Sequence, residues 1–281
     1  MKNIYTELER GSKILKENFI NSYWLDSELL LSKALNKKRE YLFLNSKETI
    51  SDNSIDKFQN LINRRKNNEP VAYILNYKEF WRNNFYVNKN VLIPRPDTEI
   101  LVEQVIKLYS REQKLSILDI GTGSGCIIIS ILKERQKFSG SAIDISKKAL
   151  NIAKYNAKIH HLNNRIKFYK SSVDNFFKHK YDLIISNPPY ISSLKLKYLE
   201  KDILGFEPIQ ALKGGMNGFN IIRKIIKQSF LLLKKGGKLI LEIGFDQKFE
   251  MLKLLKRYGF FINKTVKDYG GRDRCLICTK L

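Results

Sequence analysis

The chain has 281 residues, which is enough for two domains that each bury a core of their own. With 43% hydrophobic residues and no apolar run of membrane-spanning length, the composition excludes a disordered chain and a helical membrane protein, so we expect a soluble one. The 51 lysines and arginines against 28 acidic residues give a net charge of +23, which favours acidic or polyanionic partners, but these cations are scattered along the chain and identify no partner.

The amino terminus and the cysteines indicate the cellular compartment. Residues 1–10 carry acidic residues early and no apolar run before a small-residue cleavage site, so we expect no secretory signal. Cys126, Cys275 and Cys278 give no even disulfide framework, in agreement with a reducing compartment. Cys275 and Cys278 form C-x-x-C without a second ligand pair, and strand alternation would point them to opposite faces, so we expect a structural role and no metal. These features predict a cytoplasmic protein.

The first part of the chain predicts helices. Apolar residues recur at three-to-four spacing between Ile4 and Asn68. Asp26 is expected to open one helix, and Ser51 is expected to cap another. This pattern predicts a small all-helical domain over residues 1–78.

A linker is expected over residues 79–98. The apolar runs 79–87 and 91–93 predict two short strands or a hairpin, which Pro94-Arg95-Pro96 ends. After these prolines, residues 97–110 have the acidic opening and the apolar spacing of a helix.

From residue 114 onward, short β-branched runs alternate with helical patterns. Such alternation predicts βαβ units and a mostly parallel, doubly wound sheet, that is, an α/β fold. Two late apolar runs, 260–262 and 274–278, are joined by a loop with glycines and predict a terminal antiparallel hairpin. The other strands are expected at 115–120, 141–145, 166–169, 181–186 and 238–243.

A glycine-rich turn follows the first of these strands. Residues 121–125 read Gly-Thr-Gly-Ser-Gly, and such small residues let backbone NH groups approach a ligand closely. A bare match could bind a dinucleotide or simply pack tightly. The G-x-G-x-G spacing and the acidic Asp119 just before the turn suit a cationic, zwitterionic cofactor better than a pyrophosphate. Asp144, at the end of the next strand, is placed to bind both ribose hydroxyls, because Ser146 can cap the following helix.

The motif Asn187-Pro188-Pro189-Tyr190 directly follows the apolar strand at 181–186. Its consecutive prolines remove two NH donors, so the local backbone offers carbonyl acceptors alone. The Asn187 side-chain oxygen and the Pro188 carbonyl could each accept one hydrogen of a planar NH2 group, while Tyr190 packs on its flat face. Anchoring both hydrogens would orient the nitrogen lone pair for in-line attack on a sulfonium methyl group. A structural proline turn is the alternative interpretation.

These two motifs give the candidate site. Asn187, Pro188 and Tyr190 are the candidate catalytic residues, and the same three with Pro189 are expected to hold the substrate. The candidate cofactor-binding residues are Asp119, Gly121, Thr122, Gly123, Ser124, Gly125, Asp144 and Asn187.

Further segments carry a resemblance to a known family over nearly the whole chain. A linker signature runs from Val91 to Glu99 and contains Ile-Pro-Arg-Pro. With the two motifs above, it is similar to that of the release factor glutamine methyltransferases, the HemK/PrmC family. Other segments that match this family are Glu69–Ile74, Glu79–Trp81, Phe206–Pro208, Ala211–Gly215, Leu241–Gly244 and Gly271–Arg274.

The resemblance implies a function. It implies a class I, Rossmann-like methyltransferase domain over residues 99–281 that uses S-adenosylmethionine to methylate the glutamine side chain in the Gly-Gly-Gln motif of class-1 peptide chain release factors. The helical domain would help to recognise the release factor, and we expect a monomer with no stable nucleic-acid partner and no membrane. The chain departs from the family pattern at Asn76, where glycine is usual, and at Ser172 and Val173, where an acidic and aromatic pair often borders the adenine pocket.

Three alternatives stay open. A nucleic-acid base methyltransferase of the adenine N6 type would share the Asn187–Tyr190 motif and suit the positive charge, although no helix-turn-helix or zinc-finger spacing is visible. A ribosomal-protein glutamine methyltransferase differs from the first interpretation mainly in the amino-terminal domain. A binding module without activity is disfavoured by the intact motifs. Phe80 and Arg95 are additional candidates for the pocket.

Overall fold

The computed structural model describes residues 2–281, and their contacts divide them into two compact units. The first unit holds the described residues as far as Tyr77, together with the segment Glu200–Phe206. The second unit holds Lys78–Leu199 and Glu207–Leu281. Within residues 2–281, every helix is too short or too polar to span a lipid bilayer.

The first unit is helical, as its apolar spacing predicts. Leu15, Leu30 and Phe58 are among the buried residues that form its core. Ser51 caps a helix as predicted, because its side chain accepts a hydrogen bond from the Ser54 backbone NH. The helices are α1 (Ile4–Glu17), α2 (Tyr23–Leu35), α3 (Arg39–Leu44), α4 (Asp52–Lys66), α5 (Val71–Leu75) and α9 (Lys201–Phe206).

Asp26 does not open a helix, contrary to the prediction. Helix α2 already begins at Tyr23, and Asp26 lies within its first turn, buried inside the unit. There its carboxylate accepts hydrogen bonds from Ser22 Oγ at 2.8 Å and from Arg65 Nε at 2.7 Å. The acidic residue therefore serves as a buried ion-pair partner, which local sequence alone does not distinguish from a helix start.

Arg65 also faces the segment that joins this unit from far along the sequence. Its NH1 atom lies 3.9 Å from Asp202 Oδ2 on α9, and the same nitrogen donates to the Glu69 carbonyl at 3.2 Å. One buried guanidinium on α4 thus contacts α2, the turn that follows α4, and α9.

Asn76 replaces the usual family glycine at the end of α5. Its φ of 61° lies in the left-handed region, where asparagine is the best tolerated residue after glycine. Asn76 thus adopts a conformation that glycine would also accept.

A hairpin is present, but both of its strands lie at the first predicted run, 79–87, and not one in each run. Strands β1 (Tyr77–Phe80) and β2 (Asn83–Tyr86) form a separate two-stranded sheet. Residues 91–93 form no strand, so that part of the prediction is wrong: they lie in an irregular connection, and Val91 and Leu92 line a cavity described below. The predicted helix that follows is split into a 3₁₀ turn, η1 (Pro96–Thr98), and α6 (Glu99–Leu108), because the turn accommodates Pro96.

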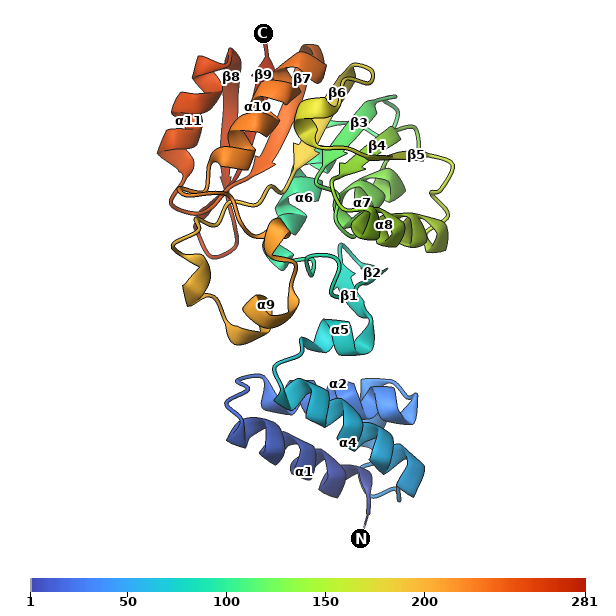
Figure 1. Ribbon diagram of the computed structural model, residues 1–281. Helices are drawn as coiled ribbons and strands as arrows, with labels where there is room; N and C mark the ends of the chain where they lie inside the picture. The colour runs from blue at the N-terminus through green and yellow to red at the C-terminus, as the bar shows by residue number, and fades with distance from the viewer. Residues whose placement is uncertain (1) are drawn as a thin grey trace. The chain divides into compact units, whose positions relative to one another are not determined.

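The second unit is built on a seven-stranded sheet with helices on both faces (Figure 1), which confirms the predicted α/β fold. The strand order is β5-β4-β3-β6-β7-β9-β8. The strands β5, β4, β3, β6 and β7 run parallel to one another, whereas β9 is antiparallel to both β7 and β8. The strands are β3 (Ser116–Ile120), β4 (Ser139–Asp144), β5 (Ile166–Lys170), β6 (Tyr181–Ser186), β7 (Leu233–Glu242), β8 (Phe260–Lys267) and β9 (Asp273–Lys280).

Alternate residues of the strands supply two separate cores. Ile117 and Leu183 pack with helices α6 and α7 (Cys126–Glu134), and their neighbours Leu118 and Ile184 pack with α10 (Asn220–Leu232) and α11 (Lys248–Arg257). The helix α8 (Lys147–Ile159) connects β4 with β5. Cys275 and Cys278 follow the same rule, since they belong to opposite cores as predicted.

The topology fixes where a ligand can bind. The chain moves outward from β3 to β4 and β5 on one side, and then from β6 to β7 on the other. At such a reversal, the loops after neighbouring parallel strands diverge and leave a crevice at the carboxyl edge of the sheet.

Candidate active site

A cavity of about 460 Å³ opens at this switch point. Loops after β3, β4 and β6 supply its floor, through Gly121, Gly123, Asp144 and Asn187. Residues 90–92 of the linker contribute to one wall, and Pro208, Gln210 and Ala211 contribute to another. The cavity thus brings together, within the second unit, segments that lie far apart in the sequence.

The glycine loop presents bare backbone to this cavity. Gly121 and Gly123 have φ angles of +74° and +54°, which side chains rarely adopt, and a Cβ atom on either would meet nothing within 4 Å. Gly125 differs, because a Cβ there would lie 2.9 Å from Ile129 Cδ1. The first two glycines therefore leave room for a ligand, while the third allows close packing of the loop on α7 and α8.

Asp144 fastens this loop from the end of β4. Its carboxylate accepts the backbone NH of Gly123 at 3.0 Å and that of Ser146 at 2.8 Å. Burial raises the pKa of Asp144, and these NH groups oppose the rise. Ser146 caps α8 through its own hydroxyl, which accepts the Ala149 NH at 3.1 Å, so Asp144 is not needed as the cap.

Asp119, before the glycine loop, and Thr122, within it, do not line the cavity. Asp119 is fully buried and accepts a hydrogen bond from Thr122 Oγ1 at 2.7 Å. Burial raises the pKa of Asp119 to about 7. Ser124 and Gly125 also lie off the cavity wall. These four residues shape the loop from within, and only Gly121 and Gly123 of the motif face the open space.

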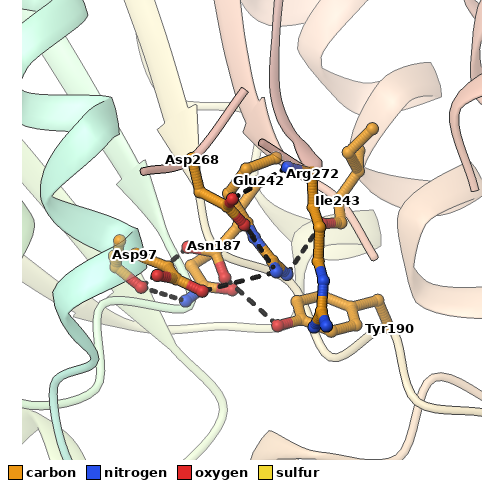
Figure 2. Close-up of polar contacts among 9 residues, drawn as sticks. Asp97, Asn187, Tyr190, Glu242, Ile243, Asp268 and Arg272 are labelled. Atoms are coloured by element: carbon orange, nitrogen blue, oxygen red, sulfur yellow. Dashed lines mark hydrogen bonds and ion pairs between the residues drawn. The ribbon is translucent and has the colours of Figure 1, made fainter. Parts of the chain in front are cut away.

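A chain of hydrogen bonds runs from Asn187 into the protein. Asn187 Nδ2 donates to Thr98 Oγ1 at 3.0 Å, and Thr98 Oγ1 donates to Glu242 Oε2 at 2.7 Å. The Tyr190 hydroxyl donates to Glu242 Oε1 at 3.2 Å. Figure 2 shows Asn187, Glu242 and Tyr190 gathered in this network. Because the Asn187 amide uses its NH2 group on Thr98, its oxygen is left to accept a hydrogen from a ligand.

Glu242 is the buried centre of this network. It ends β7, beside β6 in the sheet, and its side chain is almost fully buried. Burial raises its pKa to about 7, while the Thr98 hydroxyl and the Arg274 cation act in the opposite direction. Arg274 in turn pairs with Asp268 at 3.0 Å and lies 3.3 Å from Asp97 Oδ2. The carboxylate thus has hydrogen-bond donors and a nearby cation that offset its burial.

The backbone of the Asn187–Tyr190 turn is held by close packing. A Cβ on Gly214 would lie 2.7 Å from the Pro189 carbonyl oxygen, and one on Gly218 would lie 2.4 Å from the Tyr190 carbonyl oxygen. Gln247 Nε2 also donates to the Tyr190 carbonyl at 3.1 Å. The two glycines therefore let the following loop lie directly against the turn.

An ion pair joins the linker to the loop before Pro208. Arg95 donates to the carboxylate of the buried Glu207, which also accepts the backbone NH of Ile93 at 3.1 Å. Arg95 therefore ties two cavity walls together without lining the cavity itself. Phe80, the other pocket candidate, lies in the hydrophobic core, so that interpretation is wrong.

Residues 171–174, which follow β5, also line the cavity. Ser172 and Val173, which depart from the family pattern, both line it, as does Asp174, whose carboxylate pairs with Lys224 at 2.6 Å. Ile145 lines it as well and is 55% exposed. Sequence reasoning missed Ile145, although an apolar residue directly after Asp144 at the end of a strand was a usable signal.

The structure therefore sorts the predicted residues into two groups. Six of them line the cavity: Gly121, Gly123, Asp144, Asn187, Pro188 and Pro189. Tyr190 lies next to them in the network of Glu242. Thr98 and Glu242 were missed as site residues, because their connection to Asn187 depends on tertiary structure.

Two family models match this chain. Residues 7–75 match the model described as the PrmC N-terminal domain, and residues 96–204 match the Methyltransferase small domain. The second match contains the glycine loop, Asp144 and the Asn187–Tyr190 motif.

Known proteins resemble the chain over its length. A release factor glutamine methyltransferase from Clostridium botulinum is 39% identical over 276 residues, which cover 97% of this chain and 98% of that protein. Another, from Buchnera aphidicola, is 38% identical over 267 residues and 95% of both chains. The crystal structure of a ribosomal protein L11 methylase from Lactobacillus delbrueckii subsp. bulgaricus has a TM-score of 0.51 and 23% identity, covering 68% of this chain and 82% of that one, which is a likeness of fold.

Proposed function

Because the chain belongs to the release factor glutamine methyltransferase family, we propose that it methylates the side-chain amide nitrogen of the glutamine in the Gly-Gly-Gln motif of class-1 peptide chain release factors, with S-adenosylmethionine as the methyl donor. The observation that carries the proposal is the Asn187 amide oxygen, oriented at the wall of the cavity that also contains the glycine loop and Asp144.

The cavity fits S-adenosylmethionine. Gly121 and Gly123 leave open space above their backbone, as a closely approaching cofactor requires. Asp144 can accept hydrogen bonds from ribose hydroxyls with the lone pairs that Gly123 and Ser146 do not use. Ile145 and Val173 offer apolar surface for a flat adenine ring. When bound, this cofactor supplies an electrophilic methyl group on a positively charged sulfur.

The protein's own residues hold the acceptor nitrogen. A glutamine amide is planar and has two hydrogens, and the Asn187 Oδ1 and the Pro188 carbonyl can accept one each. This contact draws electron density toward the nitrogen and fixes its orientation relative to the cofactor site. The ring of Tyr190, whose hydroxyl is held by Glu242, lies beside the turn and can cover the face of the amide.

The proton of the amide need not be removed before the methyl group arrives. Positive charge develops on the nitrogen during transfer, which makes its hydrogens more acidic and strengthens their bonds to the two carbonyl oxygens. Interactions that strengthen in this way accelerate the step itself. The proton then leaves to solvent.

The experiment is methyl transfer from radiolabelled S-adenosylmethionine to purified release factor, ribosomal protein and duplex DNA in parallel. We expect label in the release factor alone. A release factor with alanine in place of the Gly-Gly-Gln glutamine is the matched control and should stay unlabelled. Label confined to DNA or to the ribosomal protein would overturn the proposal.

A further inference from the structure

Thr98 and Glu242 connect to the Asn187–Tyr190 motif from outside it. Thr98 lies in the turn η1 between the linker and α6, and Glu242 lies at the end of β7. Both side chains are 2% exposed. Two buried polar groups without a ligand role of their own call for an explanation, because burying them has a cost that packing of apolar residues would avoid.

The hydrogens in this network can be arranged in one way when Glu242 is ionised. An ionised carboxylate only accepts hydrogen bonds, so the single hydroxyl hydrogen of Thr98 points to Glu242 Oε2. The Thr98 oxygen can then only accept from Asn187, and the Asn187 side chain must turn its NH2 group toward Thr98. Its oxygen is consequently directed away from Thr98.

This orientation is chemically important. An asparagine amide has similar shape in its two flipped positions, but one offers an oxygen and the other an NH2 group. A substrate NH2 group needs the oxygen. In the flipped amide, the Asn187 NH2 group would face the NH2 group of the substrate, and two donors form no hydrogen bond. The flip must therefore be prevented by a neighbour that accepts hydrogen bonds alone, or by one whose hydrogen is committed elsewhere.

We propose that Thr98 and Glu242 are positioning residues that fix the Asn187 amide with its oxygen toward the acceptor nitrogen. The inference rests on the proposed function, since it assumes that Asn187 holds an NH2 group. Neither residue touches the substrate: Thr98 acts through Asn187, and Glu242 acts through Thr98.

Glu242 has a second task in the same arrangement. Its other oxygen accepts the Tyr190 hydroxyl at 3.2 Å, so one carboxylate restrains both ends of the motif. Glutamine at this position would have one accepting oxygen and one donating NH2 group, so one of the two hydroxyls would have to accept from the NH2 group and turn its own hydrogen away. A carboxylate accepts from both hydroxyls at once and therefore fixes the hydrogens of Thr98 and Tyr190 together.

The test compares Thr98→Val with Thr98→Ser. Valine keeps the shape of threonine without the hydroxyl, whereas serine keeps the hydroxyl and loses a methyl group. We expect Thr98→Val to lower kcat for release factor methylation about 10-fold to 100-fold, and Thr98→Ser to stay within about 3-fold of the unaltered protein, as for lost preorganisation of one acceptor. The Kd for S-adenosylmethionine and the KM for release factor should change by less than about 3-fold in both.

A second set of variants separates positioning from folding. If Thr98 acts only through Asn187, adding Thr98→Val to Asn187→Ala should reduce kcat by less than about 2-fold beyond Asn187→Ala alone. Melting temperatures of all variants report folding directly. Glu242→Gln should lower kcat while the Kd for the cofactor is retained.

The outcomes are distinguishable. If the unaltered protein does not label release factor, the proposed function fails. If it does, and Thr98→Val transfers methyl groups as fast as Thr98→Ser, the positioning role is wrong. Additive losses in the double variant would also overturn it, because Thr98 would then act independently of Asn187.

Discussion

The side chains of Asn187 and Thr98 meet at 3.0 Å although 89 residues separate them in the sequence. The contact joins the turn after β6 to the end of the linker that precedes α6. The motif with the chemistry and the linker signature that resembles the family are therefore parts of one site.

Replacing Asn187 should separate chemistry from cofactor binding. We expect Asn187→Ala to leave the Kd for S-adenosylmethionine within a few fold and to reduce methyl transfer by about 100-fold or more, because a preorganised acceptor is lost. Asn187→Asp should be similarly inactive, since aspartate cannot donate to Thr98 and adds a charge near Glu242. Calorimetry and label transfer measure the two quantities, and unchanged turnover in Asn187→Ala would remove the basis of the assignment.

The ionisation of Glu242 should appear in the pH profile of kcat. Burial raises its pKa to about 7, and only the ionised form accepts from both Thr98 and Tyr190. The charged groups around it are Arg274 and Asp97, with Tyr190 as a further titratable neighbour. We expect kcat to rise with pH through about 7. Glu242→Gln should lose this rise, and a variant that retained it would assign the ionisation to another group, such as Asp119.

The ionisation of Glu242 should lower the free energy of unfolding as pH rises, over the range in which it raises kcat. Its pKa in the folded protein is above the ordinary value of 4.5, so between about 4.5 and 7 the folded state binds more protons than the unfolded state. The contribution of Glu242 to the free energy of unfolding therefore falls as pH rises through this range. Glu242→Gln cannot ionise at this position. Its melting temperature minus that of the unaltered protein should therefore increase as pH rises from 4.5 to 7.5. A constant difference across this range would contradict the assignment.

Asp144 should be more important for cofactor affinity than other acidic residues of the cavity. In Asp144→Asn, one of the two backbone NH groups that the carboxylate accepts would face a donating NH2 group. We expect the Kd for S-adenosylmethionine to increase about 10-fold or more, because the glycine loop loses a hydrogen bond that holds it in place and the ribose hydroxyls lose a charged acceptor. Asp174→Asn is the matched control: its partner Lys224 is half exposed, so the Kd should change by less than about 3-fold.

Gly214 should not tolerate a side chain. A Cβ there would lie 2.7 Å from both the Gly218 and the Pro189 carbonyl oxygens, and these are backbone atoms that cannot swing away. We expect Gly214→Ala to lower the free energy of unfolding by about 1 to 3 kcal/mol and to impair transfer by shifting the turn at Pro189. Gly205→Ala, on α9 with nothing within 4 Å, should cause no loss. Equal melting temperatures for the two variants would contradict this account.

In the first unit, Arg65→Ala should leave the buried Asp26 without its charged partner. We expect a loss of about 3 kcal/mol or more in the free energy of unfolding, because the remaining carboxylate is buried and uncompensated. The pair Lys253 with Glu250 is exposed, and Lys253→Ala should change stability by less than about 0.5 kcal/mol. Chemical denaturation of both variants tests the contrast.

The sequence predicted the strands of the large sheet well because each is a short apolar run between clear turn signals. Strand β6 lies at 181–186 as predicted, and β3, β4 and β5 differ from prediction by at most two residues at an end. Strand β7 was expected from residue 238 but begins at Leu233, since its first half is polar and pairs at Tyr181 before a register shift. Its polar start carries no apolar signal.

The site residues that belong to sequence motifs were predictable for a similar reason, whereas the role of the residues that support them was not. Gly123 lies in the loop after β3, Asp144 ends β4 and Asn187 directly follows β6, so parallel pairing places them at one edge of the sheet. Thr98, inside the turn η1, has no such rule. Glu242 ends β7 at the same edge of the sheet, but the strand pattern does not indicate that its carboxylate contacts Thr98 and Tyr190. Their role depends on a hydrogen bond across the molecule.

The division of the chain into units has a practical consequence for dissecting this protein. Helix α9 belongs to the first unit, where Asp202 faces Arg65, yet it follows the Asn187–Tyr190 motif in the sequence. A fragment that ends at residue 77 would therefore lack one of its own helices. The helical unit can be produced whole only if residues 200–206 are grafted back onto it, and a chimaera that exchanges residues 2–77 with those of a relative must exchange this short segment too.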